Sequence, residues 1–175
     1  MELKKNKFDE IDLVIVNFYP FEENLKKTTN QKKIIENIDI GGPALVRSAA
    51  KNFSRVSVLS NSEQYDNFIN EINKNHGSIN LKYRLKLSKE AFLETAYYES
   101  LISNYFNKNL RDQFPKKKIF HGKIIEKLRY GENPHQESAI YSNLDNLKTI
   151  QLSGKKLSYN NYNDIFAALS ISKSF

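Results

Sequence analysis

Apolar residues in the first 110 positions alternate between strand-like runs and helix-like periodicities. Residues 11–18 form a nearly continuous apolar run rich in Val and Ile, which is typical of a strand buried on both faces of a parallel sheet. Residues 55–60 predict a second strand. The pattern predicts short helices over residues 31–37 and 43–52, and Pro43 suits the first turn of the latter because its missing N–H costs nothing there.

Two further helices are predicted before residue 110. Residues 62–75 have an apolar face of Phe68, Ile69 and Ile72, with Ser62 as the expected N-cap, and the pair at 76–77, His-Gly, ends the helix. Residues 79–109 carry long amphipathic patterning with one expected break near Ser88. We interpret the aromatic residues of this stretch as core or dimer packing.

A change of composition divides the chain. Residues 112–127 contain Pro115 and a run of lysines, which favours a segment that connects a domain over 1–111 to a domain that begins at 128. Residues 136–142 predict a strand, residues 153–154 a turn and residues 163–173 a helix. The expected fold class is therefore α/β: a partial, doubly wound parallel sheet, followed by the start of a second α/β domain.

The number of strands predicts an exposed sheet edge. Residues 8–111 offer two convincing strands, whereas a doubly wound sheet has about five or six. We therefore expect at least one edge with unpaired N–H and C=O groups, which invites aggregation or requires a partner chain.

Composition narrows the class of protein. The chain has 175 residues, 39% of them hydrophobic and 27% charged, as in an ordinary globular domain or parts of two. The absence of cysteine excludes disulfides, Cys-ligated zinc and thiol nucleophiles. The sequence indicates no metal site, no transmembrane run and no cleavable leader, and we expect a cytoplasmic protein.

The net charge of +7 raises the hypothesis of nucleic-acid binding. The lysines are scattered among many Asn and Ile residues, a combination that a bias toward A/T-rich codons produces. No recognition helix, Cys/His finger or RNA-binding aromatic motif accompanies them. We therefore expect neither nucleic acid nor membrane as a partner.

Residues 37–51 hold a first candidate site. Asp39 precedes Gly41 and Gly42, which let the backbone approach a ligand closely, and the helix that follows presents free N–H groups. Lys51 lies near the far end of that helix and cannot share its N-terminal pocket through helix geometry alone. A Gly-Gly-Pro turn with a solvated Asp and Lys is the alternative interpretation.

Residues 128–136, Leu-Arg-Tyr-Gly-Glu-Asn-Pro-His-Gln, hold a second candidate site. A guanidinium, a phenol, an amide and an imidazole on a loop with Gly and Pro suit a phosphorylated polar ligand. His135 is the histidine expected to contact it, whereas His76 and His121 are interpreted as surface or packing residues. Tyr19, at the carboxyl end of the first predicted strand, is also placed to touch a ligand. A tyrosine beside Pro20 that packs under a loop is the alternative interpretation.

These motifs occur in an order that resembles a known family. The motifs are Asn-Phe-Tyr-Pro-Phe from Asn17, Ile-Asp-Ile-Gly-Gly-Pro-Ala from Ile38, Ala-Ala-Lys-Asn from Ala49, the loop from Leu128, and Leu-Ser-Tyr-Asn-Asn from Leu157. From about residue 8 onward the chain resembles the bifunctional purine biosynthesis enzymes that combine AICAR transformylase and IMP cyclohydrolase. The resemblance implies a methylglyoxal-synthase-like first domain and a cytidine-deaminase-like second domain.

The resemblance also implies two reactions. A formyl group passes from 10-formyltetrahydrofolate to AICAR, and formyl-AICAR then closes to IMP without metal or redox cofactor. The implied catalytic residues of the closure are Tyr19, Asp39 and Lys51. Its implied substrate-binding residues are Asn17, Ile40, Gly41 and Gly42. In the transformylase half, Arg129 and Tyr130 would hold the AICAR phosphate, with His135 and Asn161 near its base. Transformylase sites of this family lie across a homodimer.

The same resemblance predicts an internal fragment. The family's Lys-Thr-Leu-His-Pro motif upstream and Lys-His pair downstream have no counterpart here, so we expect little or no activity from this chain alone. A non-catalytic remnant and a split subunit that needs a partner chain are alternatives. A basic RNA-associated protein is a third alternative.

Overall fold

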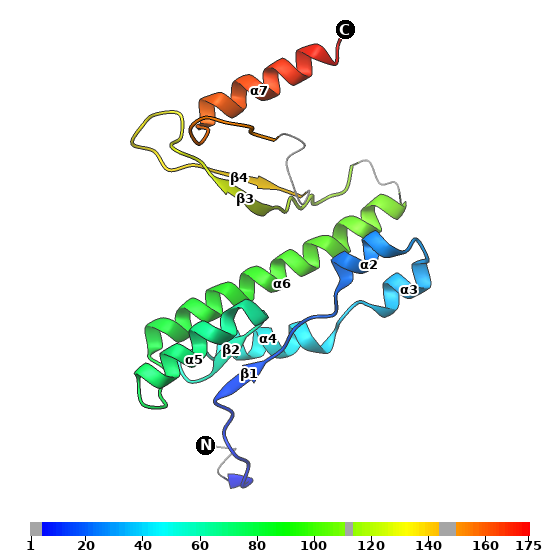
Figure 1. Ribbon diagram of the computed structural model, residues 1–175. Helices are drawn as coiled ribbons and strands as arrows, with labels where there is room; N and C mark the ends of the chain where they lie inside the picture. Colours follow the sequence, from blue (N-terminus) through cyan, green and yellow to red (C-terminus); the bar gives the residue numbers. More distant parts are fainter. Residues whose placement is uncertain (1–4, 111–113, 144–149) are drawn as a thin grey trace. The chain divides into compact units, whose positions relative to one another are not determined.

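The computed structural model describes residues 5–110, 114–143 and 150–175. The chain divides into two compact units, Met1–Ile119 and Phe120–Phe175. The first unit contains two strands, β1 (Leu13–Ile15) and β2 (Ser57–Leu59), and the helices α2 to α6 (Figure 1). The second contains a hairpin and one helix.

Strands β1 and β2 form a parallel pair, with Leu13 opposite Ser57 and Ile15 opposite Leu59, so both predicted strands are confirmed. The expected burial of the first strand on both faces is wrong. The side chains of Leu13 and Ile15 are 38% and 51% exposed, whereas Val14 packs against the core. Side chains alternate along a strand, and the core covers only one face of β1.

The predicted exposed edge is present. Val16 N–H donates to the Leu59 carbonyl and Ser57 N–H donates to the Asp12 carbonyl, so alternate residues of β1 face β2. The main-chain groups of Leu13 and Ile15 therefore point the other way. Within the described residues, no third strand pairs with this edge.

Helices α3 (Gln31–Glu36) and α4 (Gly41–Lys51) form where the sequence predicts them. The helix predicted over 62–75 is instead a short 3₁₀ turn, η1 (Ser62–Gln64), followed by α5 (Tyr65–Lys74). The expected Ser62 cap is wrong by one residue, because the Asn61 side chain accepts the Glu63 N–H at 2.9 Å. His76 and Gly77, at φ of 52° and 88°, end α5 as predicted.

Helix α6 (Leu81–Leu110) runs for 30 residues without the break predicted near Ser88. Ser88 is buried, and its hydroxyl donates to the Ala50 carbonyl at the end of α4 at 2.8 Å. The polar residue thus joins two helices instead of interrupting one. In Figure 1, α6 lies along α4 and β2, and it contacts both.

The first unit has two apolar clusters. One joins the sheet to α4, α5 and the first half of α6, and includes Val46, Leu59 and Leu87. The other joins α3 and α2 (Phe21–Lys27) to the second half of α6, and includes Phe21 and Ile34. Helix α2 was not predicted, because Phe21 is its one buried residue and gives no periodicity to detect.

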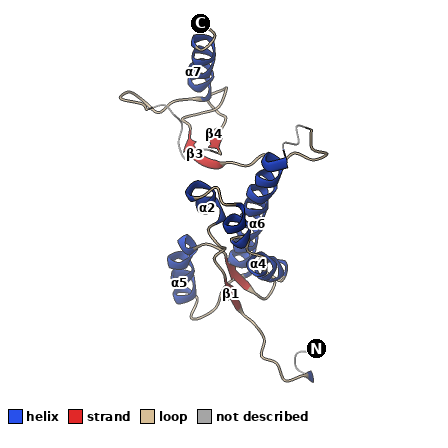
Figure 2. Ribbon diagram, turned by 90° about the vertical axis from the view of Figure 1, so that its right-hand side faces the viewer, coloured by secondary structure: helices blue, strands red, loops and turns tan. Residues whose placement is uncertain are grey.

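The second unit has the antiparallel strands β3 (Lys123–Lys127) and β4 (Ala139–Ser142), with Lys127 opposite Ala139. Helix α7 (Tyr159–Ser172) follows (Figure 2). Strand β4 is predicted by the sequence, but α7 begins four residues earlier than expected. Strand β3 was not predicted and occupies the last five residues of the expected connecting segment.

No helix in the described part of the chain combines the length and the apolar character that crossing a membrane requires.

Candidate functional site

Asp39 caps the start of α4. Its Oδ1 accepts the Gly42 N–H at 2.7 Å, which satisfies one of the free donors at the helix N-terminus. The other oxygen, Oδ2, has no hydrogen-bond partner within the described residues. Asp39 therefore holds the start of its own helix in place through one carboxylate oxygen.

Gly42 is required for this arrangement. A Cβ at Gly42 would lie 2.9 Å from the Asp39 Cγ, in addition to closer contact with Oδ2. The neighbouring Gly41 would meet no atom within 4 Å. The two adjacent glycines therefore differ. Gly42 makes room for the Asp39 carboxylate, whereas a side chain at Gly41 would meet no other atom.

Tyr98 on α6 joins the two motifs of the first unit. Its hydroxyl accepts the Asp39 N–H at 2.8 Å and donates to the Asn37 carbonyl at 3.2 Å. Its ring lies 5.1 Å from that of Phe18 and 6.1 Å from that of Phe21. The segment that contains Tyr19 and the segment that contains Asp39 thus meet at one side chain.

Burial raises the pKa of the Tyr98 phenol, although its hydrogen bond with the Asp39 backbone opposes the shift. The phenol is therefore neutral and can donate at neutral pH. The sequence analysis did not single out Tyr98. The helical spacing of Leu87, Ala91, Tyr98 and Leu101, all buried, is the signal that would have placed it on the inner face of α6.

The remaining predicted residues of the first unit lie on the surface. Tyr19 is 56% and Ile40 77% exposed, and Asn17 Nδ2 donates to the Tyr65 hydroxyl at 3.0 Å. Lys51 is the last residue of α4. At about 1.5 Å per residue, it starts roughly 15 Å from Gly41 along the helix axis. The structure thus brings the segments around Tyr19 and Asp39 together and leaves Lys51 apart, as helix geometry predicts.

In the second unit, the loop over 128–136 lies against the start of α7. Arg129 N–H donates to the Leu157 carbonyl at 3.0 Å, and Tyr159 N–H donates to the Tyr130 carbonyl at 3.1 Å. Asn160 Nδ2 also donates to the Glu132 carbonyl at 3.2 Å. Two motifs that are separate in the sequence therefore form one structural element.

Gln136 fixes the shape of this loop. Its carbonyl accepts the Gly131 N–H at 2.7 Å, and its side-chain Oε1 accepts the Asn133 N–H at 2.8 Å. A Cβ at Gly131 would lie 2.9 Å from the Gln136 Cβ, so this close approach requires glycine.

The predicted binding residues of the second unit differ in their contacts. The Arg129 guanidinium lies 4.9 Å from the centre of the Tyr130 ring, with Nη2 at 3.4 Å from the phenol oxygen. His135 is exposed. The Asn161 Oδ1 accepts the backbone N–H and the hydroxyl of Ser158, both at 3.0 Å, to cap α7. Its Nδ2 has no partner within the described residues and is available to a ligand.

Tyr162 is a supporting residue that the sequence analysis missed. Its hydroxyl donates to the Glu126 carboxylate at 2.9 Å and so ties α7 to β3. Burial, together with Glu126, raises the pKa of the Tyr162 phenol.

The sequence is similar to curated proteins of one family. Residues 49–175 match the AICARFT/IMPCHase bienzyme family. The bifunctional purine biosynthesis protein PurH of Bradyrhizobium diazoefficiens is 45% identical over 170 residues, which are 95% of this chain and 32% of that protein. PurH of Prochlorococcus marinus is 46% identical over 96% of this chain and 32% of its own length. PurH of Aquifex aeolicus is 44% identical over 99% of this chain and 35% of its own length.

A solved structure is also similar. The crystal structure of ForH aligns with a TM-score of 0.52 and 29% identity, over 61% of this chain and 55% of that chain. The chain spans about a third of the length of the curated relatives it matches. The matched residues cover most of the sequence, and the chain belongs to the AICARFT/IMPCHase bienzyme family.

Proposed function

We propose that this chain carries residues of two sites in purine biosynthesis. One site transfers a formyl group from 10-formyltetrahydrofolate to AICAR, and the other closes formyl-AICAR to IMP. The observation that carries the proposal is the hydrogen-bonded contact between two segments. One is the loop over 128–136, which carries Arg129 and Tyr130, and the other is the start of α7, which carries Asn161.

In the transformylase site, Arg129 and Tyr130 would hold the AICAR phosphate. A guanidinium is the side chain best suited to a phosphate, and its position over the Tyr130 ring limits its motion. Asn161 Nδ2 and the exposed His135 would lie near the base of the substrate.

In the cyclohydrolase site, the carboxamide nitrogen of formyl-AICAR attacks the formyl carbon, and water leaves. Asp39 Oδ2 would accept the amide proton or orient the amide, while Tyr19 and Lys51 would donate to the charge that develops on oxygen. Asn17, Ile40, Gly41 and Gly42 would hold the ring. The position of Lys51 along α4 means that it would not contact the atom that Asp39 contacts.

The wider features of the family are part of the proposal. We assign residues 1–111 to a methylglyoxal-synthase-like cyclohydrolase domain and residues 128–175 to the start of a cytidine-deaminase-like transformylase domain. We further propose a cytoplasmic homodimer. One edge of β1 pairs with no other strand of the described residues. This supports a second candidate function, that of a subunit completed by strands of another chain.

AICAR binding tests the transformylase half. Titration calorimetry on the purified chain should show that Arg129→Ala weakens AICAR binding by about tenfold or more, as loss of a charge-assisted phosphate contact does. The riboside without phosphate should be insensitive to the change. Lys155→Ala removes an exposed charge of the same unit and is the control. Equal losses in both variants, or equal binding of riboside and ribotide by the wild type, would contradict the assignment.

Turnover of formyl-AICAR tests whether the proposed cyclohydrolase site is active in this chain. We predict little or no conversion of formyl-AICAR to IMP by this chain alone, because Tyr19 is exposed and Lys51 lies far from Asp39. Chromatographic detection of IMP checks this. Conversion that Asp39→Ala abolishes would show instead that the site is complete.

A further inference from the structure

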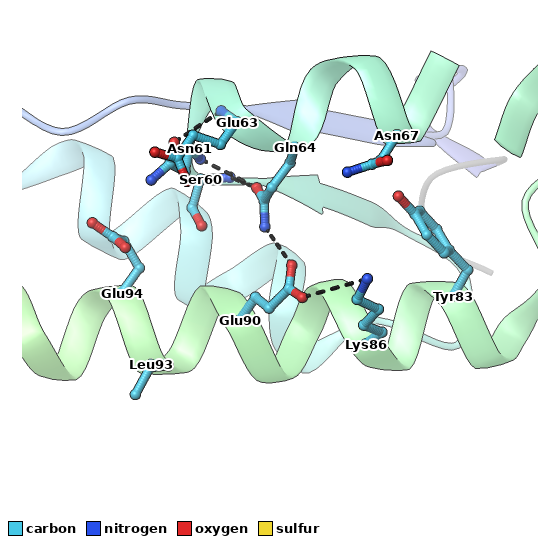
Figure 3. A pocket seen from close by; sticks show the side chains of 10 residues that line it. All are labelled: Ser60, Asn61, Glu63, Gln64, Asn67, Tyr83, Lys86, Glu90, Leu93 and Glu94. Carbon is cyan, nitrogen blue, oxygen red and sulfur yellow. Dashed lines mark hydrogen bonds and ion pairs between the residues drawn. The ribbon is translucent and has the colours of Figure 1, made fainter. Parts of the chain in front are cut away.

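A pocket of about 310 Å³ opens beyond the carboxyl end of β2 (Figure 3). Its walls come from the end of the strand, from η1 and α5, and from one face of α6. Ligands of parallel α/β sheets gather at the carboxyl ends of strands. The volume is at the lower end of the range for small-molecule sites.

Gln64 holds two walls of this pocket together. Its Oε1 accepts the Ser60 N–H at 2.9 Å, and its Nε2 donates to the Glu90 carboxylate at 2.8 Å. Figure 3 shows this side chain between the end of β2 and α6. Gln64 therefore holds the end of β2 and the Glu90 carboxylate in fixed positions relative to each other.

Ser60 supplies a buried hydroxyl without a partner. The residue is 5% exposed and lines the pocket, and its Oγ forms no hydrogen bond within the described part of the chain. No fully buried side-chain N or O atom among the described residues lacks a partner, so this hydroxyl is reached from the pocket. In Figure 3 it points toward α6. A ligand group would satisfy it.

The pocket is acidic, although the chain as a whole is basic. Carboxylates of Glu63, Glu90 and Glu94 line it, against the single ammonium group of Lys86, which lies 3.8 Å from Glu90. Burial raises the pKa of the Tyr83 phenol on the pocket wall, and the Glu90 charge raises it further. The site therefore favours a cation.

The arrangement of the carboxylates distinguishes an organic cation from a metal ion. Within the described residues, no three Asp, Glu or His side chains are grouped closely enough to hold a metal. Glu63 belongs to η1, whereas Glu90 and Glu94 belong to α6 (Figure 3). Negative charge on two walls suits a ligand with two separated cationic groups.

We propose that this pocket binds a small linear diamine. One ammonium group lies near Glu63 and the other near Glu90 and Glu94, and the Ser60 hydroxyl accepts a hydrogen bond from the ligand. This site is additional to the residues of the proposed function and does not depend on them.

Titration calorimetry of the full chain with 1,4-diaminobutane tests the proposal, with 1,4-butanediol as the neutral probe of equal length. The diamine should bind at least about tenfold more tightly than the diol, because charge-assisted hydrogen bonds are stronger than neutral ones. Similar binding of both probes, or no binding of the diamine, would overturn the proposal without the need for any variant.

Three variants locate the binding. Glu63→Gln should weaken diamine binding about three- to tenfold, and Ser60→Ala about two- to fivefold, as loss of single polar contacts does. Glu99→Gln removes an exposed carboxylate of α6 outside the pocket and should leave the affinity unchanged. An equal loss in Glu99→Gln would identify general surface attraction, and an unchanged affinity in either of the other two variants would place the diamine elsewhere.

Discussion

Tyr98 shows how one residue can position two motifs. It is 5% exposed, and its hydroxyl serves a donor and an acceptor that lie in the turn before α4. Because its ring also packs against Phe18 and Phe21, the residue couples the turn to the segment after β1. Tyr98 contributes geometry to the proposed cyclohydrolase site without being one of its predicted residues.

Tyr98→Phe should therefore destabilise the first unit. The change keeps the ring and leaves the Asp39 N–H and the Asn37 carbonyl without their partner, at a cost of about 1–3 kcal/mol. Urea unfolding followed by circular dichroism measures it. Tyr105→Phe is the matched control, because Tyr105 packs on Phe21 and its hydroxyl has no partner within the described residues. Equal unfolding midpoints for the two variants would contradict the role of the hydroxyl.

At the scale of elements, the start of α4 depends on a contact between a side chain and a glycine. Asp39 can accept the Gly42 N–H because no Cβ occupies the space beside its carboxylate. Gly41 faces open space in the same helical turn. A pair of adjacent glycines thus provides an internal comparison.

Gly42→Ala should lower the free energy of unfolding by about 1–2 kcal/mol, because the new methyl group displaces the capping carboxylate. Gly41→Ala should be neutral, or stabilising by up to about 1 kcal/mol, because alanine restricts the unfolded chain. Thermal and urea unfolding of both variants test the difference. Loss of stability in Gly41→Ala, or none in Gly42→Ala, would show that the cap does not control this helix.

The elements that the sequence predicted are those with a clear hydrophobic period. The helices α3, α4, α5, α6 and α7 were predicted from such patterns, whereas the first parallel strand was predicted from a continuous apolar run. Helix α2 buries only Phe21, and β3 has the sequence Lys-Ile-Ile-Glu-Lys with no fully buried residue, so neither leaves a strong pattern. The prediction of a break at Ser88 was wrong. A polar residue that donates a hydrogen bond to a neighbouring helix cannot be distinguished in the sequence from one that ends a helix.

At the scale of the whole molecule, the main feature of the first unit is the edge of β1 that no strand in the described part of the chain covers. Leu13 and Ile15 are partly exposed, and their main-chain groups face away from β2. An edge of this kind pairs readily with another strand.

Ile15→Lys should reduce self-association of the chain, because a lysine on an edge strand opposes pairing with a second copy. Light scattering over a range of protein concentrations measures this. Leu81→Lys removes an apolar residue of similar exposure, 53%, from the start of α6 and should have a smaller effect. Association that is unchanged in Ile15→Lys, or reduced equally in both variants, would point away from the edge.

The sequence points to candidate site residues by their type and motif. It does not show which other side chains they contact. The sequence proposes Asp39 and Arg129 as site residues from the chemistry of their motifs, and these roles stay predictions. Helix geometry separates Lys51 from Asp39. The sequence did not identify Tyr98 or Tyr162, because their partners are distant in sequence: the hydroxyl of Tyr98 meets a backbone group 59 residues away. Nor did it indicate the pocket beside β2, whose walls come from the end of that strand, from η1, from α5 and from α6.

The pairing of Leu13 with Ser57 also governs the order of folding. A contact between residues so distant in the chain must overcome the entropy of closing a long loop, so parallel pairs form slowly. The local contacts of α6 form much faster. During that interval both edges of β1 are available to other chains, so productive folding competes with association, and the balance shifts toward association as the protein concentration rises.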